Sequence, residues 1–120
     1  MPVPATPFDI PAASAQLAAG RMLVMGVIIG ESSGVATAKV RIRDGVTVAG
    51  TRVLPFTLAA NESVRDWFGD YGIVYEQGLF VEVVAGAVEG SIAVVLESRI
   101  GPGAFARLVH SLVEGVEHVS

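Results

Sequence analysis

Short runs of apolar residues, separated by turn residues, make up most of this chain. The clearest pattern lies in residues 35–43 (VATAKVRIR), where apolar and polar side chains alternate. Successive side chains of a strand point to opposite faces, so this alternation predicts a strand with one face in a core and the other in solvent. The Asp44-Gly45 pair follows directly and predicts a two-residue hairpin turn.

Apolar runs on both sides of this strand extend the pattern. Residues 12–17 fit either a short helix or an edge strand, and we favour the strand because a turn follows at residues 18–20. Residues 21–31 (RMLVMGVIIGE) are almost continuously apolar, which indicates a strand buried on both faces, or on one face with an interface on the other. Further strands are expected at 46–49, 51–58, 73–76, 78–84 and 91–97. Seven or eight short strands predict an all-β fold, an antiparallel β-sandwich or jelly roll over residues 12–100.

The middle of the chain contains the only tryptophan and both tyrosines. Ser63 and Asp66 have the spacing of a capping box, which predicts one helical turn through Trp67. Asp66, Trp67, Phe68 and Tyr71 are expected to form a structural corner, with Trp67 and Phe68 closing the end of the sandwich. The alternative is that these aromatic rings are exposed and anchor a partner.

The two ends of the chain depart from the strand pattern. Residues 1–11 contain four prolines, and because proline fixes φ and lacks an N–H, an extended arm is expected. Residues 101–120 have apolar side chains at helical spacing, which predicts an amphipathic helix packed on the sandwich or on a neighbouring subunit. Partner contacts are expected from Pro4, Pro7, Phe8 and Ile10 of the arm and from Phe105, Leu108, Leu112 and Val116 of the helix.

The composition of the chain favours self-association. Hydrophobic residues make up 52% of the chain and charged residues only 17%, so we expect apolar surface to be buried in a homo-oligomer. The alternative is that alanine and valine of a well-covered core account for these values. A net charge of −4 argues against nucleic-acid binding, which usually needs a basic face. The longest apolar run, residues 22–29, is much shorter than the ~20 residues of a membrane helix.

No residue pattern points to catalysis. The absence of cysteine excludes disulfides, thiolate zinc sites and cysteine nucleophiles. His110 and Glu114 have the spacing of metal ligands, but a lone pair of this kind is more typical of a solvated helix face. The acids at positions 66, 70 and 76 are expected to pair with Arg65. We therefore expect no enzyme activity, no metal, no cofactor and no small-molecule substrate.

Three motifs resemble a known group of proteins. They are SSGVATAKVRIRDG, NESVRDWFGDYG and GLFVEVVAGAVEG, within residues 10–97. This stretch resembles small β-sandwich structural proteins in the virions of tailed actinobacteriophages. The resemblance implies a non-enzymatic capsid decoration or minor capsid protein that stabilises the head lattice, binds the major capsid protein and is assembled in the host cytoplasm. A tail, connector or baseplate component is the alternative.

Carbohydrate binding is a separate hypothesis, in which Trp67 and Tyr71 act as stacking platforms on the virion surface. Exposure of Trp67 beside carboxylates would favour it, and burial of Trp67 would remove it.

Overall fold

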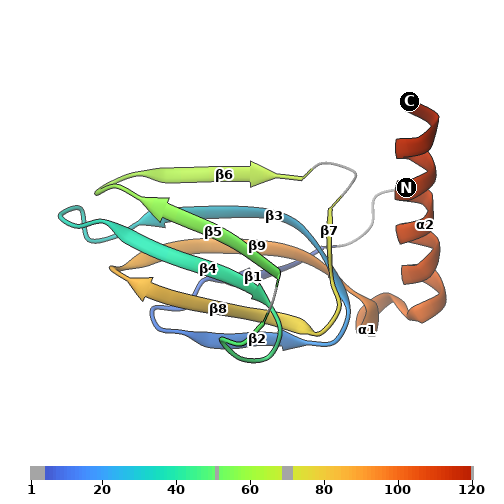
Figure 1. Cartoon of the computed structure of the whole chain (residues 1–120), viewed down its shortest axis with the longest axis horizontal. Helices are drawn as coiled ribbons and strands as arrows, with labels where there is room; N and C mark the ends of the chain where they lie inside the picture. The colour runs from blue at the N-terminus through green and yellow to red at the C-terminus, as the bar shows by residue number, and fades with distance from the viewer. Residues whose placement is uncertain (1–4, 51, 69–71, 120) are drawn as a thin grey trace.

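The chain folds into two antiparallel β-sheets with helices at one end (Figure 1). The computed structural model describes residues 5–50, 52–68 and 72–119, and at 52, 53 and 111–119 it describes the backbone alone. The first sheet consists of β1 (Thr6–Asp9), β3 (Met22–Glu31), β6 (Ser63–Trp67), β7 (Ile73–Tyr75) and β9 (Val88–Leu96). The second sheet consists of β2 (Ala15–Ala19), β4 (Ala38–Asp44), β5 (Arg52–Leu58) and β8 (Gly78–Ala85). The helices are α1 (Glu97–Ile100) and α2 (Pro102–Val119).

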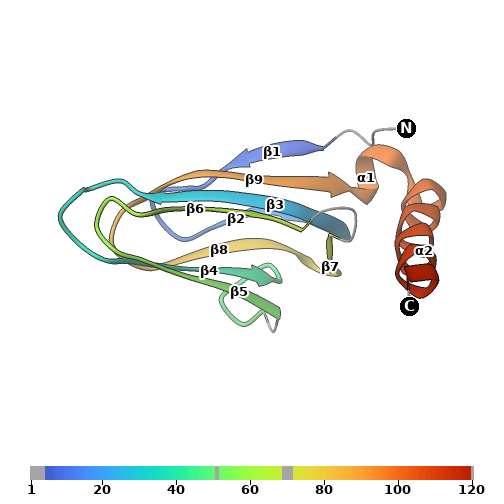
Figure 2. The same cartoon turned by 90° about the horizontal axis from the view of Figure 1, so that it is seen from above.

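The strand order of the two sheets is that of a jelly roll. The first sheet has the strand order β1-β9-β3-β6 and the second has the order β2-β8-β4-β5. Figure 2 shows the two sheets facing each other. The pairs are nested, β1 with β9, β2 with β8, β3 with β6 and β4 with β5. A long hairpin rolled into two sheets gives this order. The short strand β7 is an addition, paired with β3. The expected all-β sandwich is therefore confirmed.

The core lies between the sheets and follows the alternation of the strands. In β4, Ala38, Val40 and Ile42 are buried, whereas Lys39 and Arg41 are exposed, as the sequence pattern predicts. Tyr75 is fully buried, and its hydroxyl donates a hydrogen bond of 2.7 Å to the carbonyl of Ile42. This bond joins β7 to the opposite sheet and satisfies the one polar atom of the Tyr75 side chain.

Asp44 does not form the predicted two-residue turn. It is the last residue of β4 and pairs with Arg52, so the connection from β4 to β5 is longer than two residues. The carboxylate of Asp44 instead accepts hydrogen bonds from the backbone N–H groups of Glu76, Gln77 and Gly78, at 2.9, 2.8 and 3.4 Å. An Asp-Gly pair favours a tight turn locally, but here the aspartate holds a turn that lies far along the chain.

A second buried carboxylate organises the opposite end of the sandwich. Glu31 accepts hydrogen bonds from the hydroxyl and N–H of Ser33 and from the N–H groups of Gly34 and Asn61. The Ser33 hydroxyl is the main reason that the pKa of Glu31 falls from 4.5 to about 2, and the backbone donors of Asn61, Ser33 and Gly34 lower it further against the opposing effect of burial. One side chain therefore fixes two loops.

Helix α2 packs on the outer face of the first sheet, next to the end of β9. Phe105 is buried against Leu23 and Val95, with Leu108 and Val109 partly buried beside it. Arg21 holds this junction, because its Nε donates to Glu97 of α1 at 2.7 Å and its guanidinium lies 5.0 Å from the Phe105 ring centroid. The first half of the helix therefore packs on its own subunit.

Candidate functional site

Most of the expected arm is part of the sandwich. Residues 6–9 form β1, which pairs with β9, so the sandwich begins at Thr6 and not at residue 12. Ile10 is buried in the core, so the prediction that it binds a partner is wrong. Phe8 is partly buried against the core, and its contact with a partner stays a prediction. An extended segment that alternates apolar residues completes its own sheet in preference to remaining free. Pro7 is exposed on the outer face, and Pro4 lies outside the described residues.

The expected corner is also different. Residues 63–67 form strand β6, not a helical turn, because they pair along β3 from Gly30 to Gly26. Phe68 packs against the core as expected, but Trp67 is 67% exposed and does not close the sandwich. Asp66 is exposed and caps no helix in the described structure, and Tyr71 lies outside the described residues. Ladder pairing outweighed the local capping signal.

Trp67 lies on the outer face of the first sheet, over the backbone of β3. It is paired with Gly26, and a Cβ atom added to Gly26 would clash with Cε3 of the indole and lie 2.9 Å from Cζ3. A glycine within a strand often marks such a close approach. Because Gly26 has no side chain, the indole can pack directly on the backbone of β3.

Strand register places two rows of side chains across this outer face. The first row runs Pro7, Ala93, Gly26, Trp67, and the second runs Asp9, Ser91, Ile28, Arg65. A third, shorter row contains Glu89, Gly30 and Ser63. The rows are about 7 Å apart, since side chains on one face recur every second residue of a strand. Apolar and polar groups thus lie side by side on a sheet face that α2 leaves open.

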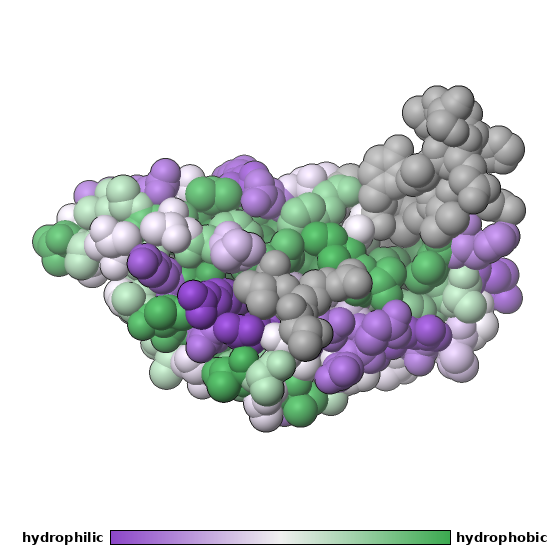
Figure 3. Space-filling model, in the orientation of Figure 1, coloured by the Kyte–Doolittle hydropathy of each residue, from purple (hydrophilic) through white to green (hydrophobic). Residues whose placement is uncertain are grey.

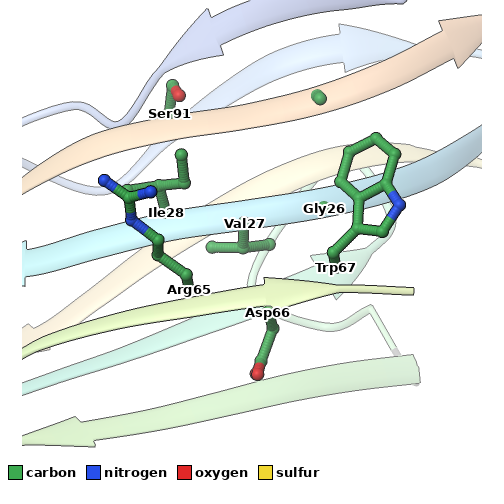
Figure 4. Close-up of a pocket in the computed structure, with 8 residues that line it drawn as sticks. Gly26, Val27, Ile28, Arg65, Asp66, Trp67 and Ser91 are labelled. Atoms are coloured by element: carbon green, nitrogen blue, oxygen red, sulfur yellow. The ribbon is translucent and has the colours of Figure 1, made fainter. Parts of the chain in front are cut away.

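Two hollows lie between these rows. The first has a volume of about 170 Å³, and Figure 4 shows it between Trp67 on one side and Ile28 and Arg65 on the other, with Gly26 as part of its floor. Its surface is almost entirely apolar. The second hollow, of about 400 Å³, also borders Ile28 and Arg65 but is lined in equal part by polar groups, including Ser63 and Glu89. Together they form a groove along β3 and β6.

Polar side chains around the groove have no partner within the part of the chain that the structure describes. This holds for Arg65, Ser91, Asp9, Glu89 and the indole N–H of Trp67. The expected pairing of Arg65 with neighbouring acids is therefore not seen among the described residues, and Asp70 lies outside them. These donors and acceptors remain available to a ligand.

The outer face of the second sheet is different in character. Figure 3 views this face, where hydrophilic residues cross the strands in a band. Glu82 lies 3.0 Å from Nε of Arg43 and 3.8 Å from Arg41, and Arg43 also donates to the carbonyl of Gly50 at 2.9 Å. Two of the three basic side chains of β4, Arg41 and Arg43, thus form ion pairs within the fold. This makes the face a weaker candidate for a binding site.

The helix residues divide into two groups. Phe105 is only 1% exposed, so the prediction that it contacts a partner is wrong, and Leu108 is partly buried beside it. The side chains of Leu112 and Val116 lie outside the described part of the structure, although the helical backbone continues through both positions.

Within the described ranges, no group of three or more histidine, cysteine, aspartate or glutamate side chains is placed to hold a metal ion. No helix among the described residues is long and apolar enough to cross a membrane. The chain matches no family model, and no curated protein or solved structure is significantly similar to it.

Residues of the groove other than Trp67 were not singled out from the sequence as binding residues. Ile28, Ser91 and Ala93 belong to two different strands, and only the register of β3 with β9 places them together. The one local signal was Gly26, a glycine inside an apolar run, which indicates a close approach of another group.

Proposed function

We propose that this protein is a non-enzymatic structural component of a bacteriophage particle, a head decoration or minor capsid protein that binds and stabilises the head lattice. Its partners are further copies of itself and the major capsid protein, and its location is the virion, after assembly in the host cytoplasm. A tail, connector or baseplate component is the alternative position in the particle.

The supporting observation is that the apolar stripe of α2 continues in the sequence beyond the helix side chains whose packing the structure describes. The helix extends from Pro102 to Val119, and its observed packing on the sheet involves Phe105, Leu108 and Val109. In the sequence the same stripe continues at Leu112, Val113 and Val116. In Figure 1 the last turns of α2 lie beyond the ends of the strands. A stripe of this kind is used for helix contacts between proteins, and we assign it to a neighbour in the lattice.

Fold and sequence pattern support this proposal in a more general way. The resemblance of residues 10–97 is to virion structural proteins, and the jelly roll is a common architecture of viral capsid domains. Because one fold serves many functions, the helix and not the fold carries the proposal.

The test uses the particles produced by the genome that encodes this chain. The Leu112→Lys/Val116→Lys variant should remain folded, because lysine favours a helix and the described core between the two sheets consists of residues between Phe8 and Leu96. We expect its occupancy on purified particles, measured by quantitative mass spectrometry, to fall at least about tenfold, as for loss of an interface anchor.

The control is Ser111→Lys/His118→Lys, which adds the same two lysines on the polar side of the helical pattern and should leave occupancy unchanged. The proposal fails if the wild-type protein is absent from purified particles. It also fails if the stripe variant attaches at wild-type occupancy. Hundreds of copies in a particle would indicate the head, and a few to dozens the tail or connector.

A further inference from the structure

We propose that the groove beside Trp67 binds a neutral saccharide chain, with one sugar ring stacked on the indole and the next in the polar hollow. This site is distinct from the α2 stripe, so the inference does not depend on the proposed attachment to a particle.

The indole is a pre-positioned stacking platform. Trp67 is 67% exposed, yet its ring is seated on Gly26, which leaves it one open face in a defined orientation. A sugar ring has an apolar C–H face that packs on an aromatic ring, and a rigid aromatic side chain loses little conformational entropy on binding.

The two hollows match the two chemical characters of a sugar. The hollow next to Trp67 is apolar and takes the C–H face of a ring, with Gly26 and Ala93 as a floor of small residues. The neighbouring hollow, between the rows of Arg65 and Ser63, is lined about equally by polar and apolar groups and takes hydroxyl groups. Ile28 and Arg65 line both hollows, so the hollows are neighbours and suit consecutive rings of one chain.

Unpaired hydrogen-bonding groups surround the stacking position. Within the described structure the side chains of Arg65 and Ser91 on the second row, and of Ser63 and Glu89 on the third, make no hydrogen bond to protein. Donors and acceptors are therefore both present, as sugar hydroxyls require. The carboxylates of Asp9 and Glu89 lie on the same face and offset the positive charge of Arg65, so the site does not attract a strongly anionic ligand.

A protein partner fits this surface less well. A stable protein interface buries about 800 Å² on each partner. On this face α2 already covers the end formed by Leu23, Val74 and Val95, and the exposed apolar surface that remains centres on Trp67 and Ile28. A groove with one apolar hollow and one of mixed lining suits a chain of small rings better than a broad protein surface.

Trp67 is the only tryptophan of the chain, so its fluorescence reports on this site alone. The full-length protein is titrated with cellohexaose, maltohexaose, laminarihexaose and chitohexaose, and binding is measured in parallel by calorimetry. We expect at least one of these to give a saturable blue shift with a Kd below about 1 mM. The one that binds identifies the sugar and linkage, and hence the kind of polysaccharide recognised.

Variants separate stacking from other effects. Trp67→Ala should weaken binding in calorimetry at least about tenfold and Trp67→Phe much less, since a flat ring is retained. Arg65→Ala and Ser91→Ala should each weaken it by a factor of about 2–10, the loss of a hydrogen bond. Val84→Ala is the control, because Val84 is 44% exposed on the second sheet, away from the groove, and should change nothing.

The inference is overturned if none of the four oligosaccharides binds at up to about 10 mM, a limit that corresponds to negligible affinity. Equal binding by wild type and Trp67→Ala also overturns it. A blue shift with purified particles and none with any oligosaccharide would make the face a protein contact, again overturning it. Loss of particle attachment in the α2 variant with sugar binding intact would leave this inference standing.

Discussion

Trp67 and Gly26 are paired across two antiparallel strands, and the indole of the first occupies the space that any side chain at the second would need. The pairing explains why the large ring of Trp67 remains on the surface, although the next residue, Phe68, packs against the core. The ring packs on the backbone of β3, so its position is fixed although most of its surface is exposed.

Substitution of Gly26 by alanine should displace the indole and destabilise the fold. The added Cβ would clash with the ring and lie 3.1 Å from the carbonyl oxygen of Asp66, so we expect a loss of about 1–3 kcal/mol, as for other overpacked sites. Urea unfolding measures this loss, and Trp67 fluorescence reports the new position of the ring.

The double variant Gly26→Ala/Trp67→Ala is the control for that result. If the clash with the indole is the cause, the alanine at position 26 should cost much less once the ring is absent. An equal cost in both backgrounds would assign the effect to the backbone of β6.

Stability should fall in acid because of Glu31. Its pKa is about 2 in the folded protein against 4.5 for an unperturbed carboxyl, so its contribution is complete above 4.5 and is lost as the pH falls towards 2. Glu31→Gln should lower stability at neutral pH and flatten this part of the pH profile, measured by thermal unfolding between pH 2 and 6. Glu76→Gln, at an exposed position, should leave the profile unchanged. A steep acid loss that persists in Glu31→Gln would assign it to other groups.

Arg21 should control the docking of the helices. Replacing it with alanine removes the ion pair with Glu97 and the stacking on Phe105, which together contribute about 1 kcal/mol at this half-exposed position. We expect faster hydrogen exchange in residues 97–110 and little change in the strands. Arg107→Ala, on the exposed side of α2, is the matched control. Unchanged exchange in Arg21→Ala would mean that Phe105 alone fixes the helix.

Asp66 should keep the β6 edge from pairing with other chains. Its neighbours Val64 and Phe68 pack against the core, whereas Figure 4 shows Asp66 pointing away from the outer face of the sheet, at the open edge. A charge on the inward side of an edge strand opposes addition of a further strand. Asp66→Val should therefore self-associate in light scattering, and Asp66→Asn less so. A monomeric Asp66→Val protein would show that the edge is protected in another way.

The sequence predicted those parts of the fold that depend on short-range pattern. Alternation in residues 35–43 predicted a strand and its buried face, observed as β4 at Ala38–Asp44, and helical spacing predicted α2. Pro55 lies in β5, the last strand of its sheet, where a residue without an N–H group is tolerated. Periodicity gives these results because it reports directly on which face of an element is buried.

What depends on distant partners was not predictable from one sequence. Ser63 to Asp66 has the spacing of a helix cap, but pairing with β3 decided its structure. The arm was expected to be separate because of its prolines, yet β1 tolerates Pro7 on an edge strand. Trp67 was expected in the core because large aromatic residues are usually buried. Only the register of β6 with β3, which places Trp67 opposite Gly26, puts it on the outer face.

The nested pairing of strands sets when this chain can fold. β1 pairs with β9, and β2 with β8, so both sheets are incomplete until the residues up to Leu96 have been synthesised. Contacts this distant in sequence make folding slow compared with that of helical domains of the same size. The growing chain therefore leaves the ribosome with both sheets incomplete. Pro7, Pro55 and Asp66 lie on edge strands and oppose pairing with other chains in the interval before the jelly roll closes.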